Sequence, residues 1–168
     1  MKDLPTVILG TLRSDVLCES TLKEVGRRIG PDARKVLRTT PFSRRGERIP
    51  LTAISNAELG FTQDVTRLQT YEAALKLRLE IVPAEIGPGL GAIYYDQPAG
   101  EELMIGMEPL VLKGFRRIFT VEHTPATGLW LSLCKSHITL RFPPSTIWVF
   151  GKQVGIVSDD SETHRLVA

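Results

Sequence analysis

Between residues 103 and 150, apolar side chains recur at every second position, and this alternation constrains the fold more than any other feature of the sequence. The alternation occurs in four runs, around 103–108, 118–123, 129–134 and 147–150. A period of two is typical of β-strands, and Lys113-Gly114 supplies one of the turns between the runs. The second half of the chain therefore predicts an antiparallel sheet of four to five strands.

The first half shows helical spacing instead. A short helix is predicted over 21–29, capped by Ser20 or Thr21, and a second begins at Asp32, so that the two form a helix-turn-helix-like pair. A longer amphipathic helix is predicted after Thr62. Its apolar positions are Val65, Leu68, Tyr71, Ala74 and Leu75. Short strands are expected over 5–9 and 51–54.

Together these elements predict the α+β class: N-terminal short helices and a central amphipathic helix, packed on a C-terminal antiparallel sheet. The expected domain covers residues 1–152, and an edge strand with a solvated tail follows over 153–168. One face of the sheet is expected to be partly aromatic and either covered or used for binding. Its aromatic residues are Phe119, Trp130, Trp148 and Phe150.

The segment 83–109 joins the two halves and is rich in glycine, proline and acids. Gly87-Pro88-Gly89-Leu90-Gly91-Ala92 formally matches a dinucleotide-binding pattern, but no helix of several turns is expected after it to meet a pyrophosphate. The glycines are therefore interpreted as close-packing positions, and the segment as a turn-rich junction that docks the helices on the sheet.

Acidic side chains in this segment are the candidates for catalysis. A carboxylate pair such as Glu85 and Asp96 would suit a small metal-assisted hydrolase or nuclease, although capping and solvation explain such residues more simply. Tyr94, Tyr95 and Gln97 are binding candidates in the same stretch. No metal or cofactor is expected, because Cys134-x-x-His137 lacks the second half of a zinc site.

Positive charge gathers between Lys23 and Arg48, although the net charge is only +2. The binding candidates here are Arg27, Arg28, Arg34, Lys35 and Arg38. Such a stretch can meet a nucleic acid or an acidic protein, and it can equally be a solvated helix face.

No apolar run approaches the roughly 20 residues that cross a bilayer, so we expect a cytoplasmic protein without membrane contact. Cys18 and Cys134 are far apart in the sequence, and buried free thiols are expected rather than a disulfide.

A series of short motifs resembles an uncharacterised family of small bacterial proteins. The motifs are Ala57-Glu58-Leu59-Gly60-Phe61-Thr62, Val82-Pro83-Ala84-Glu85-Ile86-Gly87-Pro88, Tyr94-Tyr95-Asp96-Gln97-Pro98, Gly100-Glu101, Met107-Glu108-Pro109, Gly128-Leu129-Trp130-Leu131 and Trp148-Val149-Phe150. Members tend to have an arginine near Gly91-Ala92 and an aromatic residue at Glu102, so any site built on those side chains is altered here. The resemblance implies no activity.

The function that we expect from the sequence is a non-catalytic binding or accessory protein that contacts a protein or a nucleic acid. An enzyme that uses the carboxylates of 83–109 is the alternative, and a structural subunit of a larger assembly is a third hypothesis.

Overall fold

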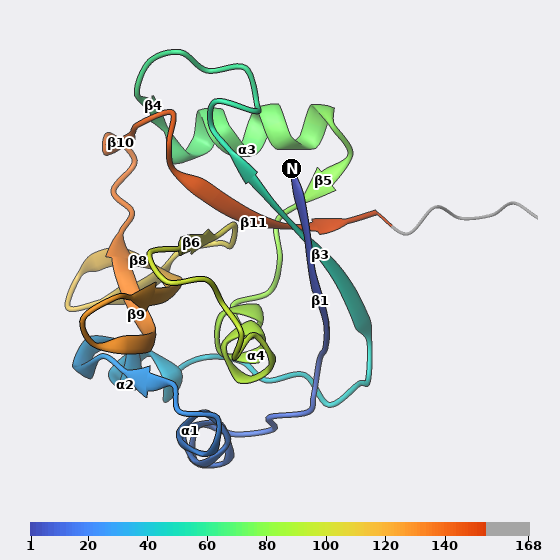
Figure 1. Ribbon diagram of the computed structural model, residues 1–168, viewed down its shortest axis with the longest axis vertical. Coiled ribbons are helices and arrows are strands. Elements are labelled where there is room, and N and C mark those ends of the chain that lie inside the picture. The colour runs from blue at the N-terminus through green and yellow to red at the C-terminus, as the bar shows by residue number, and fades with distance from the viewer. Residues whose placement is uncertain (154–168) are drawn as a thin grey trace, which may run out of the picture.

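The computed structural model, which describes residues 1–153, is built on one large and mostly antiparallel sheet (Figure 1). Within that range the sheet has nine strands: β1 (Lys2–Ile8), β2 (Arg28–Ile29), β3 (Arg48–Ser55), β5 (Leu79–Glu80), β6 (Glu102–Ile105), β7 (Leu110–Leu112), β8 (Phe115–Thr124), β9 (Gly128–Lys135) and β11 (Ile147–Lys152). A separate pair is formed by β4 (Val65–Thr66) and β10 (Arg141–Phe142). The α+β class is confirmed. The count of four to five strands was too low, because four strands of the first half join the sheet.

The main order of the sheet is β1-β3-β11-β6-β8-β9-β2, with β5 beside β11 and β7 beside β8. The strand β11 lies at the centre, where Trp148 is opposite Ile54 of β3 and Met104 of β6. It is antiparallel to β3 and parallel to β6. The sheet is therefore not the purely antiparallel one that the sequence suggested. Apart from residue 153, the predicted edge strand and tail lie outside the described residues.

Helices cover both faces of the sheet (Figure 1). On one face, the helix α4 (Ile86–Ile93) packs against Phe119 of β8, beside α1 (Asp15–Glu24) and α2 (Pro31–Leu37). On the other face, α3 (Arg67–Lys76) places Tyr71 edge-on against Trp148 and Phe150, with ring centroids 5.7 Å apart in each pair. Helices thus enclose the central strands on both sides.

The expected single aromatic face is wrong for Phe119. Thr120 is in register with Met104, which is in register with Trp148, so Thr120 and Trp148 share a face. Phe119 precedes Thr120 and points to the opposite side, because neighbouring residues of a strand alternate. Trp130 is opposite Glu122 and lies on the Trp148 side.

The first helical pair differs from its prediction in both boundaries and connection. The helix α1 begins after Ser14, whose Oγ accepts a hydrogen bond from the Leu17 N–H at 3.2 Å, rather than after Ser20 or Thr21. The predicted end of this helix is instead the strand β2, which pairs with β9 in parallel. A strand separates the two helices, so they do not form a helix-turn-helix.

The central helix starts later than predicted, at Arg67, because Thr66 and Gln69 form a capping box there. Leu68 and Leu75, which the helical period assigned to the core, are 54% and 63% exposed. The helix packs mainly through small or polar side chains such as Thr70 and Ala74.

Residues 86–93 form a buried helix, so the prediction of a turn-rich junction was wrong for this part of 83–109. The prediction that its glycines serve close packing is confirmed. A Cβ on Gly87 would lie 2.6 Å from Phe119 Cβ, and one on Gly89 would lie 2.8 Å from Val7 Cγ1. Only hydrogen fits between α4 and the sheet at these positions. None of the helices within 1–153 is long and apolar enough to cross a membrane.

Candidate functional site

Arg27, predicted as an exposed binding residue, is 2% exposed and lies in the interior. Its Nε donates to the Gly91 carbonyl at 2.7 Å, and its Nη2 donates to the Tyr94 carbonyl at 2.8 Å. Its Nη1 lies within hydrogen-bonding distance of Gln97 Oε1 and of the Glu122 and Trp130 carbonyls, at 3.0 to 3.2 Å. Burial lowers the pKa of Arg27 to about 10. This guanidinium therefore joins α4, β8 and β9 and is not available to a partner.

Gln97 and Tyr94 belong to the same interior cluster. Gln97 is 2% exposed, and its Nε2 donates to the Val121 carbonyl at 2.9 Å. Tyr94 is also buried, and its hydroxyl accepts a hydrogen bond from Lys2 Nζ at 2.8 Å. Tyr95 alone of these three points outward, with 69% of its surface exposed. Tyr94 and Gln97, two of the three binding candidates, are thus held by hydrogen bonds inside the protein.

Glu85 and Asp96 do not form a catalytic pair. Glu85 is 2% exposed, and its two carboxylate oxygens accept hydrogen bonds from the Gly10 and Ser43 N–H groups, each at 2.7 Å. Asp96 is exposed and follows the other end of α4. Eight helical residues between them span about 12 Å, which exceeds the roughly 5 to 10 Å of paired catalytic carboxylates.

The remaining cations of the 23–48 stretch are exposed, and several already have partners. Arg34 Nε lies 3.4 Å from a Glu19 oxygen, and Lys35 Nζ lies 3.9 Å from an Asp32 oxygen. The Arg28 guanidinium lies over the Trp130 ring, 5.6 Å from its centroid. Arg38 is exposed at the end of α2. Three of these cations therefore have contacts within the chain, whereas no ion pair in residues 1–153 involves Lys23, Arg38, Arg44, Arg45 or Arg48.

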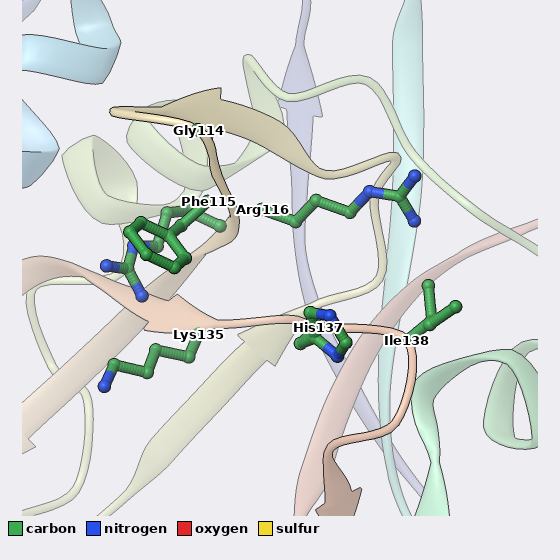
Figure 2. Close-up of a pocket in the computed structure, with 7 residues that line it drawn as sticks. Gly114, Phe115, Arg116, Lys135, His137 and Ile138 are labelled. Atoms are coloured by element: carbon green, nitrogen blue, oxygen red, sulfur yellow. The ribbon is translucent and has the colours of Figure 1, made fainter.

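A second cationic region, which the sequence analysis did not single out, lies at the β7–β8 hairpin (Figure 2). Its pocket has a volume of about 510 Å³ and is lined by Gly114, Phe115, Arg116, Arg117, Lys135, His137 and Ile138. We call these residues, with Lys113 at the tip and Val111 on β7, the hairpin surface. It brings together segments of β8 and of the chain that leaves β9.

The turn of this hairpin consists of Lys113 and Gly114, whose φ values are 50° and 79°. Two successive positive φ values define a type I′ turn, which usually carries Asn-Gly or Gly-Gly. A lysine in this conformation costs roughly 1 kcal/mol. The chain therefore holds a cation at an exposed tip where the backbone favours another residue.

The charges of the hairpin surface are not neutralised. Arg117 is directly opposite Lys135 in the β8–β9 pair, and like charges placed opposite each other destabilise a sheet. The lining contains no carboxylate, and in residues 1–153 no ion pair involves Lys113, Arg116, Arg117 or Lys135. An anion placed here would relieve this repulsion.

A signal for this region was present in the sequence, since Lys113-Gly114-Phe115-Arg116-Arg117 carries three cations in five residues. The sequence could not show that Lys135 lies opposite Arg117, because this pairing depends on the register of β8 and β9.

The described residues offer little for metal or thiol chemistry. No group of three or more His, Cys, Asp or Glu side chains that could hold a metal occurs in residues 1–153. Both cysteines are free, as expected, with Cys18 buried and Cys134 half-buried. Burial raises the pKa of Cys18 to about 12 and that of Cys134 to about 11, so both are protonated thiols at neutral pH.

Comparison with protein-family models, with curated proteins and with solved structures gives no match for this chain. The resemblance to small bacterial proteins thus stays a prediction.

Proposed function

We propose that the protein is a non-catalytic, cytoplasmic binding or accessory protein that holds an anionic region of a protein or nucleic acid at its hairpin surface. The observation that carries the proposal is the pair Arg117 and Lys135, placed opposite each other with no ion pair to either side chain in residues 1–153. Such a pair lowers stability in the free protein, and an anionic partner would compensate for that loss.

The organisation of the pocket supports the same function. Arg116 and Arg117 follow each other on β8 and therefore project to opposite sides of the strand. Arg116 and Lys135 extend to opposite sides of the pocket in Figure 2, and Arg117 is opposite Lys135 in the β8–β9 pair. Arginine suits this role because its planar fork can bind a carboxylate or a phosphate through two hydrogen bonds.

The test compares two variants that each lose three positive charges. The hairpin variant carries Arg116→Gln, Arg117→Gln and Lys135→Gln, and the matched control carries Arg34→Gln, Lys35→Gln and Arg38→Gln on α2. Binding of a fluorescent single-stranded oligonucleotide and of a fluorescent oligoglutamate is measured by anisotropy at low and high salt.

We expect at least one polyanion to bind wild type at low salt. Binding by the hairpin variant should be about tenfold weaker, since three exposed charges contribute roughly 0.5 kcal/mol each. Binding by the α2 control should change much less. The proposal fails if neither polyanion binds wild type at low salt, if the two variants lose equal affinity, or if only the α2 variant loses it. The last result would place the site on the basic stretch predicted from the sequence.

A further inference from the structure

The hairpin surface combines its cations with exposed apolar side chains. Val111, Phe115 and Ile138 are 65%, 62% and 46% exposed. Val111 is directly opposite Arg116 in the β7–β8 pair, so an apolar group and a cation share one face of the hairpin. Ile138 lines the pocket together with the cationic side chains. The surface therefore presents alternating apolar and positive groups.

The combination of apolar and cationic side chains distinguishes between the two proposed partner classes, protein and nucleic acid. Surfaces that bind nucleic acid without reading sequence combine cations with several aromatic rings on which bases stack. Here two of the three apolar groups are aliphatic and have no ring face. Phe115 and His137 supply its two rings, and the Arg117 guanidinium lies 5.7 Å from the Phe115 ring centroid. Exposed apolar side chains beside arginine are typical of protein interfaces, where apolar area is buried inside a polar rim.

We infer that the hairpin surface binds a protein segment in which an apolar side chain is flanked by acidic residues. This inference depends on the proposed function and names its partner class. The order of apolar and acidic side chains in the partner follows from the residues that line the pocket. Phe115 and Lys135 project to one side, Arg116 and Ile138 project to the other, and His137 lies between them (Figure 2).

In this arrangement the apolar side chain of the partner packs between Phe115 and Ile138. Its acidic neighbours reach the cations on the two sides, Arg117 and Lys135 on one and Arg116 on the other, and no ion pair within residues 1–153 involves any of the three. A volume of about 510 Å³ falls in the range of roughly 300 to 1,000 Å³ that is usual for ligand pockets, so it can take several side chains of a peptide.

The experiment uses two peptides of equal length and charge, one with alternating Glu and Leu and the other with alternating Glu and Ser, together with a single-stranded oligonucleotide. Each is titrated against the full-length protein and against a variant with Val111→Ser, Phe115→Ser and Ile138→Ser. These side chains are exposed, so the fold should tolerate the changes, and equal urea midpoints serve as the control.

Wild type should bind the Glu-Leu peptide about tenfold more tightly than the Glu-Ser peptide, because one buried leucine contributes that much. The variant should lose this preference and keep its affinity for the Glu-Ser peptide. Equal affinity of wild type for the two peptides overturns the inference, as does tighter binding of the oligonucleotide, and in both cases the proposed anion-binding surface stands. If none of the three probes binds at low salt, the proposed function fails and the inference fails with it.

Discussion

Replacing Arg27 with methionine would remove a buried guanidinium that contacts five oxygen acceptors. Those acceptors are the carbonyls of Gly91, Tyr94, Glu122 and Trp130 and the side-chain oxygen of Gln97. Methionine keeps a flexible apolar stem in the interior but donates no hydrogen bond. The acceptors would then remain inside the protein without this partner.

The size of the effect follows from two opposing contributions. Nη1 has two hydrogens for its three acceptors, so the guanidinium makes about four full hydrogen bonds, which at roughly 1.8 kcal/mol each amount to about 7 kcal/mol. Burial lowers the pKa of Arg27 to about 10, which corresponds to roughly 3 kcal/mol against the buried charge, and methionine avoids this cost. The net loss in the free energy of unfolding is therefore about 4 kcal/mol.

Urea unfolding followed by circular dichroism measures this loss. With a denaturant dependence of about 2 kcal/mol per M, the midpoint should fall by roughly 2 M. The neighbouring Arg28→Met is the control, because Arg28 is exposed and its contact with the Trp130 ring is worth about 1 kcal/mol or less. If the two variants have similar midpoints and Arg27→Met loses polyanion binding, Arg27 is a surface binding residue and the reasoning is refuted.

Two further predictions concern the sheet. Lys113→Asn should raise the free energy of unfolding by about 0.5 to 1 kcal/mol, because asparagine tolerates positive φ. The same change should weaken polyanion binding. Equal or lower stability in urea would contradict the strain at the tip. Burial and the opposite Glu122 raise the pKa of Glu102, so Glu102 favours the fold at low pH and this contribution is lost as the pH rises through its folded pKa. Glu102→Gln should therefore be more stable than wild type by about 0.5 kcal/mol at pH 7, and this difference should disappear near pH 4. A stability difference that does not change with pH would refute the prediction.

The strands of the second half could be predicted because alternation is a local property. The runs near 118–123 and 129–134 correspond to β8 and β9, although β8 is buried at the four successive positions 118–121 and β9 is fully buried only at Leu131, because helices cover both faces of the sheet. In α3 the helical period placed Tyr71 and Ala74 correctly, because both pack inside the protein. It failed for Leu68 and Leu75, which are exposed.

The helix α4 shows why the segment 83–109 was misinterpreted. Glycine and proline normally interrupt helices, and this helix contains Gly87, Pro88, Gly89 and Gly91 within eight residues. Tertiary packing outweighs that preference here, because the helix approaches Phe119 too closely for any side chain at Gly87. Such an approach cannot be deduced without knowing the partner strand.

The candidate residues failed for a related reason. A charged side chain is expected at the surface, and nothing near Arg27 in the sequence indicates that carbonyls from α4, β8 and β9 converge on it. The hairpin surface, by contrast, is exposed and was not predicted. Its cations come from two segments about 20 residues apart, and only the sheet register brings them together.

The central position of β11 also has a consequence for synthesis of the protein. The pair β1–β3 and the group β6–β8–β9 meet only through β11, which is the last strand of the described chain. While the polypeptide is being made, the two parts of the sheet expose the facing edges of β3 and β6, and open edges favour aggregation. A nascent chain that stops before residue 147 would keep both edges exposed, because the sheet is closed only when β11 is added.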